Sequence, residues 1–204
     1  MDNTALYKLC YGVFMVASKN GDAINGCITN TCIQVASNPT RIACAVLNKN
    51  LTCDYIKASG KFTVSILDKE CSFDTIKHFG LQSGRDVNKF EYLEPSVDAE
   101  GIPYMGWSTL AMLSASVVES HDLGSHTLFI AEVTDAKNLG EGEPMTYSYY
   151  QSDVKPKPAA AAEVRKPKAW RCTICGYIYE GEVLPPDFVC PLCAHPASDF
   201  EPIY

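Results

Sequence analysis

Short runs of apolar residues, many alternating with polar ones, dominate residues 1–151 of the chain. Runs of this length between turn-forming residues are typical of β-strands rather than of helices. The turn Lys-Asn-Gly-Asp at residues 19–22 predicts a hairpin between the two strands that flank it. The predicted strands cover residues 11–18, 23–29, 42–47, 62–67, 110–119, 126–136 and 145–150.

Two short segments interrupt this pattern with helical signals. One covers Leu51–Ser59, with Asn50 or Thr52 as its N-terminal cap and a glycine just past its end. The other covers Phe73–Phe79, and it follows Ser72 and also ends at a glycine. Many strands with few helices predict a mainly β domain, a barrel.

The apolar pattern stops at residues 152–168, which are rich in Pro, Ala and Lys and contain only two valines as large apolar residues. Such a segment cannot bury a core, so it is predicted to be a semi-extended tether. The chain therefore divides into a body at 1–151, this linker, and a small tail domain at 169–204.

Composition and charge narrow the class of protein. The net charge of −7 disfavours a general nucleic-acid binder, which needs a basic surface to neutralise phosphates. A basic start followed by an apolar run is absent, and so is an apolar stretch of membrane-spanning length. We therefore expect a cytoplasmic protein without membrane association, whose ten cysteines stay reduced.

The tail contains two Cys-x-x-Cys pairs, Cys172 with Cys175 and Cys190 with Cys193. Two such pairs can supply the tetrahedral set of four thiolates that both zinc and iron accept. Because the tail is too short for a large core, metal binding would supply much of its folding energy. Spacing alone leaves a structural zinc ribbon and an iron centre as alternatives.

The tail reads Cys-x-x-Cys-Gly-Tyr-Ile-Tyr-Glu-Gly, then a Pro-rich turn, Cys-Pro-x-Cys and Asp199-Phe200-Glu201. In this series the whole tail resembles the rubredoxin family, in the compact form found at the end of rubrerythrins. The resemblance implies one iron that carries single electrons. Ala194 departs from the family, which usually has glycine there. The aromatic residues of the tail are predicted to form its core: Tyr177, Tyr179, Phe188 and Phe200.

Six segments of the body form an ordered series: residues 11–16, 25–39, 48–52, 62–67, 79–90 and 124–133. Through these segments the body resembles the flavin reductase family with the FMN-binding split β-barrel. A dinucleotide-binding glycine fingerprint and a P-loop are both absent from the sequence. The resemblance implies a homodimer that binds FMN near the subunit interface.

Short polar residues in these segments are the candidate FMN ligands. Asn48, Asn50 and Thr52 lie where a predicted helix begins, and free N–H groups there favour a phosphate. The edge formed by residues 30–34 can meet the rim of the flavin ring. The predicted FMN-binding residues are Asn30, Thr31, Cys32, Gln34, Asn48, Asn50, Thr52, Ser83, Gly84 and Arg85. Helix capping or a solvated loop is the ordinary alternative for each.

His126 resembles the histidine that lies near flavin and nicotinamide in this family, so it is the candidate catalytic residue. A histidine that begins a strand can also be purely structural. The body cysteines lack the spacing of metal ligands and are predicted to be mostly buried small hydrophobes: Cys10, Cys27, Cys32, Cys44, Cys53 and Cys71.

The two halves together resemble the high-molecular-weight rubredoxins. The resemblance implies hydride transfer from NAD(P)H to FMN, then single electrons to the iron and on to a flavodiiron protein. The alternatives are an electron-transfer module whose flavin is reduced by a partner protein, or a flavin-binding regulator with a zinc ribbon. The tail has a net charge of −4, and its residues Glu180, Glu182 and Asp187 predict an acidic docking surface.

Overall fold

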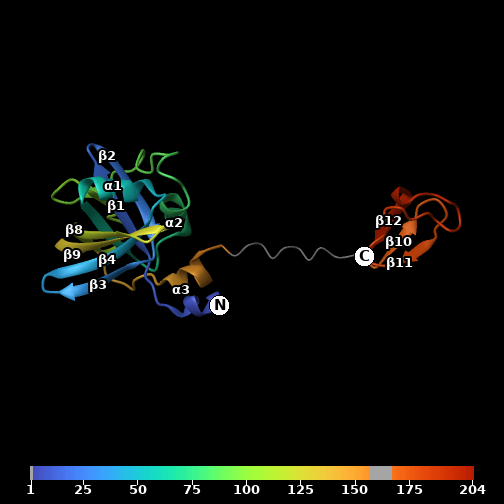
Figure 1. The fold of residues 1–204 in the computed structure, drawn as a ribbon, viewed down its shortest axis with the longest axis horizontal. Coiled ribbons are helices and arrows are strands. Elements are labelled where there is room, and N and C mark those ends of the chain that lie inside the picture. The colour runs from blue at the N-terminus through green and yellow to red at the C-terminus, as the bar shows by residue number, and fades with distance from the viewer. Residues whose placement is uncertain (1, 157–166) are drawn as a thin grey trace. The chain divides into compact units, whose positions relative to one another are not determined.

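A computed structural model describes residues 2–156 and 167–204 of the chain. They belong to two compact units, residues 1–156 and 157–204, which are coloured from blue to orange and in red in Figure 1. Most of the predicted tether, residues 157–166, lies outside the described residues. Within the described ranges, no helix combines the length and the apolar character needed to cross a bilayer.

The larger unit is built on one antiparallel sheet of seven strands in the order β2-β1-β5-β8-β9-β4-β3. The strands are β1 (Phe14–Asn20), β2 (Ala23–Thr29), β3 (Cys32–Ser37), β4 (Thr40–Leu47), β5 (Lys61–Leu67), β8 (Thr109–Asp122) and β9 (His126–Asn138). A separate short pair consists of β6 (Ser96–Val97) and β7 (Pro103–Tyr104). The prediction of a mainly β fold is confirmed.

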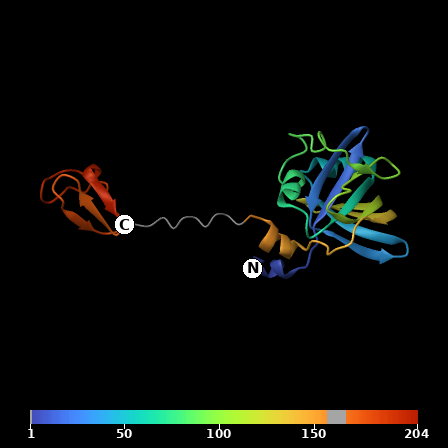
Figure 2. The same cartoon turned by 180° about the vertical axis from the view of Figure 1, so that it is seen from behind.

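The sheet buries large apolar side chains on both of its faces. Phe62 and Phe129 pack with ring centroids 6.3 Å apart in one cluster, which also receives residues of β1, β4 and helix α1 (Leu51–Ser59). A second cluster around Met15 and Phe79 lies between the sheet, helix α2 (Phe73–Gly80) and the end of the unit. Figures 1 and 2 show α1 and α2 beside β1 and β2.

Both predicted helices are confirmed. Ser72 caps α2, since its hydroxyl accepts a hydrogen bond from the N–H of Thr75 at 3.2 Å. Helix α1 ends at Gly60, whose φ of 70° is the left-handed conformation that glycine adopts without strain. Asn50 occupies the N-cap position of α1, but its side chain makes no capping hydrogen bond. That side chain instead interacts with the Cys27 thiol, where it partly opposes the rise in the pKa of Cys27 that burial causes.

The strand predicted at residues 145–150 is wrong, because helical turns form there instead. Thr146 makes a single bridge to Gly12, and then α3 (Tyr147–Tyr149) and the π-helical turn η2 (Tyr150–Val154) follow. The Thr146 hydroxyl caps this segment by accepting a hydrogen bond from the N–H of Tyr149. Tyr147, Tyr150 and Val154 recur at helical spacing and pack on the second cluster, which outweighs the strand preference of tyrosine.

The structure also contains an N-terminal helix that the sequence did not predict, and an edge strand, β3, that is longer than predicted. The 3₁₀ helix η1 (Asn3–Lys8) lies beside α3, and Leu6 and Tyr147 line one groove. Strand β3 covers Cys32–Ser37, where the sequence indicated only an edge over residues 30–34. Its mostly exposed residues give it no clear apolar alternation to recognise.

The smaller unit is a three-stranded sheet with an aromatic core. The strands β10 (Ala169–Cys172), β11 (Ile178–Glu180) and β12 (Phe200–Ile203) lie in the order β11-β10-β12, and η3 (Ala197–Asp199) precedes the last strand. The ring of Phe188 packs 4.7 Å from that of Tyr179 and 5.4 Å from that of Phe200. The predicted aromatic core is confirmed.

A buried lysine joins α2 to the sheet. Lys89 is only 3% exposed, and its ammonium group donates to the carbonyls of Gly26 at 2.9 Å and Phe79 at 2.7 Å. Burial lowers the pKa of Lys89, and the nearby Cys27 thiol partly opposes that shift. The lysine thus satisfies two carbonyls that no water can reach easily.

We expect Lys89→Met to lower the free energy of unfolding by about 2 kcal/mol, because it leaves those buried carbonyls without a donor. Chemical denaturation of the full chain measures the change. Lys77→Met, at an exposed lysine of α2, is the matched control and should stay within about 0.5 kcal/mol of the parent protein. Equal losses in both variants would contradict the role given to Lys89.

Candidate functional sites

A cleft of about 350 Å³ opens in the larger unit, where several chain segments meet. Asn30 lies just after β2, Asn50 just before α1, and His126 at the start of β9. Leu47 pairs with His126 in the register of β4 and β9, so these two line the same wall. Three of the predicted site residues thus share one cavity.

The wall that holds Asn30 is fixed by short hydrogen bonds. Thr29 donates through its hydroxyl to the carbonyl of Ala45 at 2.8 Å, which connects the end of β2 to β4. The side-chain oxygen of Asn30 accepts from the hydroxyl of Thr31 at 3.0 Å, so its amide nitrogen remains as a donor for a ligand. Thr31 therefore orients Asn30.

The polar character of the cleft comes from groups with different chemistry. Asn50 stands at the N-terminus of α1, where the helix dipole attracts negative charge, and its side chain is free of capping. The Nδ1 atom of His126 lies 2.8 Å from the hydroxyl of Ser125, which fixes the plane of the ring. The cleft therefore offers an anion-favouring helix N-terminus at Asn50 and an oriented imidazole ring at His126.

The helical segment near the end of the larger unit supplies cleft residues that the sequence did not reveal. Tyr147, Tyr150, Gln151 and Lys155 all line the cavity. Burial raises the pKa of Tyr150, and the adjacent Tyr147 adds to the effect, so Tyr150 keeps its hydroxyl proton. The helical spacing of these tyrosines was the available signal. Lys155, which the sequence assigned to the tether, brings a positive charge to the cleft.

Two of the predicted ligands, Asn48 and Thr52, use their side chains in hydrogen bonds within the fold. Asn48 donates to Asp122 at 3.0 Å and to the carbonyl of Gly124 at 2.9 Å, and its oxygen accepts from Thr127 at 2.6 Å. Thr52 is fully buried and donates to Asn25 at 2.9 Å. These bonds hold the start of α1 against the strands.

The other candidates lie at two separate grooves. Cys32 and Gln34 line an apolar groove of about 280 Å³ beside the edge strand β3. Gly84 and Arg85 line a third groove, where Arg85 pairs with Asp54 of α1. The side chain of Asn25 packs so tightly on Gly84 that an added Cβ would lie 1.9 Å from its amide nitrogen. Ser83 accepts a hydrogen bond from the N–H of Arg85 at 3.1 Å, which orders this turn.

The smaller unit brings the four tail cysteines together as predicted. Their sulfur atoms all lie within 4.8 Å of one another, with Cys172 and Cys193 3.7 Å apart and Cys175 and Cys190 3.5 Å apart. Cys172 and Cys190 are buried, whereas Cys175 is exposed. Four soft thiolates at such distances form the donor set of a tetrahedral iron or zinc site, so the residues present fit a single metal ion.

Two turns of the same geometry hold these sulfurs. The Cys172 N–H donates to the Tyr177 carbonyl at 2.8 Å, and the Cys190 N–H donates to the His195 carbonyl at 2.8 Å. Backbone N–H groups also point at sulfur. Burial raises the pKa of Cys190, but hydrogen bonds from the amides of Cys193 and Leu192 and from the thiols of Cys175 and Cys193 outweigh burial and lower it to about 7. A thiol with this pKa is readily available as a thiolate ligand.

The two turns differ at one position. Gly176 has a φ of 77°, and Ala194, which follows the other pair, has a φ of 56°. Both values are left-handed, so the missing glycine of the second turn places a methyl group in a conformation that costs about 1 kcal/mol or more.

Comparisons with known proteins match both units. The model of the flavin reductase like domain matches residues 6–157, and that of the rubrerythrin, rubredoxin-like domain matches residues 170–201. A high molecular weight rubredoxin of Moorella thermoacetica is 37% identical over the full length of both chains. A ferric-chelate reductase (NAD(P)H) of Archaeoglobus fulgidus is 35% identical over 80% of this chain and 97% of its own. The solved structure of flavin reductase PheA2 is 27% identical, with a TM-score of 0.58 over 72% of this chain and 93% of its own.

We expect Ala194→Gly to stabilise the metal-bound small unit by about 1 kcal/mol, since glycine adopts a positive φ without strain. The mirror variant Gly176→Ala should destabilise it by a similar amount, because nothing lies within 4 Å of the added Cβ and only the backbone cost remains. Loss of the metal–thiolate absorption during heating measures both. A shift of the same sign in the two variants would refute this account of the turns.

Proposed function

The chain belongs to the flavin reductase-like family, and from that membership we propose that it is an NAD(P)H:rubredoxin oxidoreductase. Electrons from NAD(P)H would enter at the cleft of the larger unit and leave from the metal centre of the smaller one. The observation that carries the proposal is the presence, in one chain, of a flavin reductase domain and a rubredoxin-like set of four cysteines. We take NAD(P)H as donor because a similar relative is a ferric-chelate reductase (NAD(P)H).

The two cofactors explain why both units are needed. Bound FMN supplies chemistry that accepts a hydride, two electrons at once, and can release them singly, whereas a single iron accepts one. The cleft residues fit FMN by chemistry. In this proposal Asn50 and the N-terminus of α1 face its phosphate, the Asn30 amide meets the ring, and Lys155 offsets negative charge. His126 holds the nicotinamide in place.

The remaining predicted ligands act less directly in this proposal. Asn48 and Thr52 support the start of α1, and Thr31 orients Asn30. Cys32 and Gln34 stay at their own groove beside β3, outside the cleft. We also propose a homodimer, for which the groove at Gly84 and Arg85 is open to a second copy. Exposed apolar residues of β3 support it, since Ile33 and Val35 are 60% and 48% exposed.

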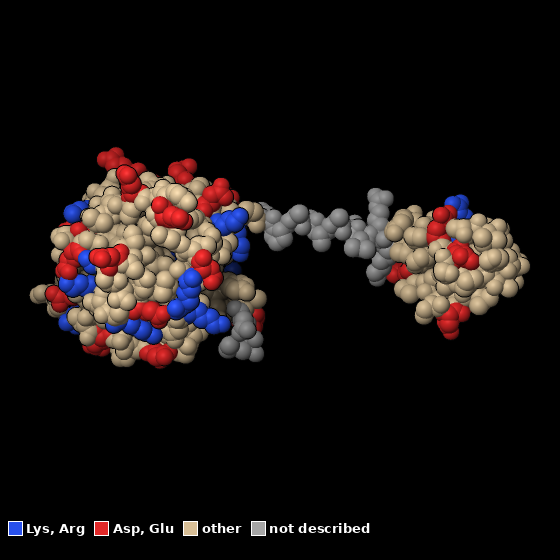
Figure 3. All heavy atoms as spheres, turned by 90° about the horizontal axis from the view of Figure 1, so that it is seen from above, with Lys and Arg blue, Asp and Glu red and all other residues tan. Residues whose placement is uncertain are grey.

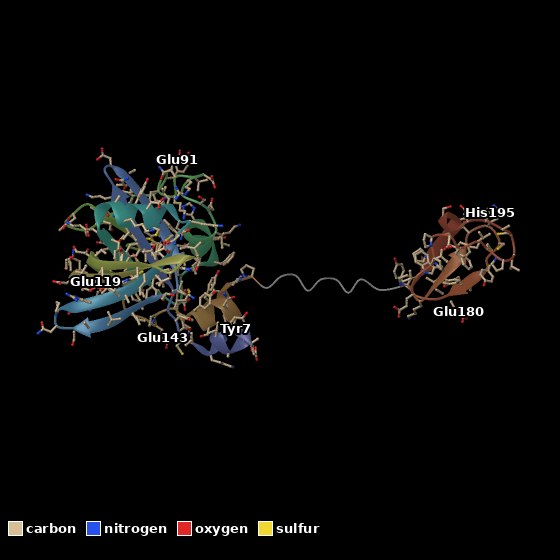
Figure 4. The ribbon with its side chains drawn as sticks, in the orientation of Figure 1. Tyr7, Glu91, Glu119, Glu143, Glu180 and His195 are labelled. Carbon is tan, nitrogen blue, oxygen red and sulfur yellow. The ribbon has the colours of Figure 1, made fainter. Side chains whose placement is uncertain are left out.

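The surface around the metal centre supports a proposal for where an electron acceptor would bind. Ile174 and Leu192 lie within the two Cys-x-x-Cys turns and are 58% and 72% exposed, next to the exposed Cys175. Glu180 pairs with Ala169, the first residue of β10. Cys172 is the last residue of that strand, roughly 10 Å from Ala169, so Glu180 lies away from the metal ligand. Figure 4 shows Glu180 and His195 at different sides of the small unit, and in the view of Figure 3 the acidic residues of that unit form separate spots rather than one patch. We therefore propose an apolar docking surface beside the metal, and the acidic surface of Glu180, Glu182 and Asp187 is the alternative that the experiment below distinguishes.

Two other functions make different predictions. A flavin-binding regulator would hold zinc, which metal analysis detects directly. An electron-transfer module would need a partner protein to reduce its flavin, so NAD(P)H alone would leave its spectrum unchanged. The similarity to reductases favours the enzyme.

The proposed direction of electron flow predicts the behaviour of a variant without the metal site. We expect Cys190→Ser to lose the ferric–thiolate absorption while retaining FMN binding and anaerobic NAD(P)H oxidation with an excess of free FMN. The two compact units have separate cores, so damage to one should spare the other. Absorption spectra and NADH consumption measure this. Failure of the parent protein to oxidise either nicotinamide would exclude the proposed function.

The docking proposal predicts which surface change slows transfer to an acceptor. With a flavodiiron protein as acceptor, Leu192→Ser should slow iron reoxidation several-fold, because it removes exposed apolar area from the contact. Glu180→Gln is the matched control and should leave the rate unchanged. The ferric spectrum of both variants confirms that the site is intact. A slower rate in Glu180→Gln alone, strongest at low salt, would instead support acidic docking.

A further inference from the structure

Two free cysteines of the larger unit face each other across neighbouring strands. Cys32 at the start of β3 is in register with Cys44 of β4. The Ala45 N–H donates to the Thr31 carbonyl at 3.0 Å, which makes those two residues a hydrogen-bonded pair. The next pair along, Cys32 with Cys44, is therefore a non-hydrogen-bonded pair, the closer of the two kinds.

That position suits a disulfide. In a non-hydrogen-bonded antiparallel pair the Cα atoms are about 4.5 Å apart and the side chains share one face of the sheet. A disulfide spans Cα separations of roughly 4.4–6.8 Å, so the bond needs no movement of the backbone. In the strand pairing of the described residues, no other two cysteines are in register.

The two thiols differ in access to solvent. Cys44 is fully buried in the core, whereas Cys32 is half-buried and lines the groove beside β3. The Cys32 thiol and burial both raise the pKa of Cys44 well above its ordinary value. A reagent from solvent therefore meets Cys32 first, and Cys44 stays a protected thiol until its neighbour has reacted.

We propose that Cys32 and Cys44 are a redox-sensitive dithiol, which hydrogen peroxide converts to a reversible disulfide between β3 and β4. The sulfur of Cys32 attacks one peroxide oxygen, the O–O bond breaks, and water leaves as Cys32 becomes a sulfenic acid. The sulfur of Cys44 then attacks that of Cys32, the S–O bond breaks, and a second water carries away the Cys44 proton. Two thiols thus give up two electrons, and one peroxide becomes two waters.

The bond would tie down an edge of the sheet next to the cleft. Strand β3 is the last strand of the sheet, and it has β4 as its neighbour. Asn30, which lines the cleft, lies two residues before Cys32. A disulfide in a reduced compartment is usually transient and redox-sensing, which agrees with a bond that forms only under peroxide. The proposal needs no flavin, so it stands apart from the proposed function.

Peptide mapping of the full chain tests the proposal. After mild treatment with hydrogen peroxide, alkylation of the remaining thiols and tryptic digestion, we expect residues 20–41 linked to residues 42–49, and dithiothreitol should separate them. Fragmentation of the linked pair identifies the bonded sulfur, which is needed because the first peptide also contains Cys27. This measurement uses the parent protein and does not depend on any variant folding.

Variants then assign the bond. Cys32→Ser should abolish the link, while Cys27→Ser, the matched control at a buried cysteine of β2, should retain it. A link that persists in Cys32→Ser would overturn the proposal. So would peroxide treatment that oxidises the exposed Cys10 completely while Cys32 and Cys44 remain open to alkylation after unfolding.

Discussion

The register between β4 and β9 is the constraint on which the cleft depends. It sets Leu47 opposite His126, at the end of β4 from which the chain enters α1. The bond from Thr29 to the Ala45 carbonyl then brings the end of β2, and with it Asn30, to the same place. A shift by one residue would turn every side chain of β4 to the other face. Backbone pairing, more than contacts among their side chains, therefore brings the cleft residues together.

The metal centre depends on a different constraint, the local hydrogen bonding of a Cys-x-x-Cys turn. This turn occurs twice in the small unit. Each turn closes with a hydrogen bond from the first cysteine to a carbonyl five residues later, and each aims backbone N–H groups at sulfur. Such turns need little of the surrounding fold. This explains how a unit whose buried core is a few aromatic rings can place four thiolates within 4.8 Å of one another.

The sequence predicted which four cysteines meet in the small unit, but only some of the residues that line the cleft, for physical reasons. Spacing alone determines which cysteines meet in a Cys-x-x-Cys turn. Asn50, Asn48 and Thr52 are equally polar and lie within five residues, yet only Asn50 faces the cavity, because the other two are used by Asp122 and Asn25. Lys155 was not predicted as a cleft residue because a lysine beside prolines is typical of a linker. Tyr147 was not predicted as a cleft residue because tyrosine favours strands. The cap by Thr146 and packing on the core stabilise helical turns there instead.

In the proposed function, electrons enter at the flavin cleft and leave through the iron of the same chain. Rapid mixing of the oxidised protein with NADH or NADPH under argon, observed at the absorption bands of flavin and of ferric thiolate, follows both steps. We expect the flavin band to bleach first and the ferric band to follow without any added protein. Reduction of the iron without prior bleaching of the flavin, or no bleaching with either nucleotide, would rule out this route.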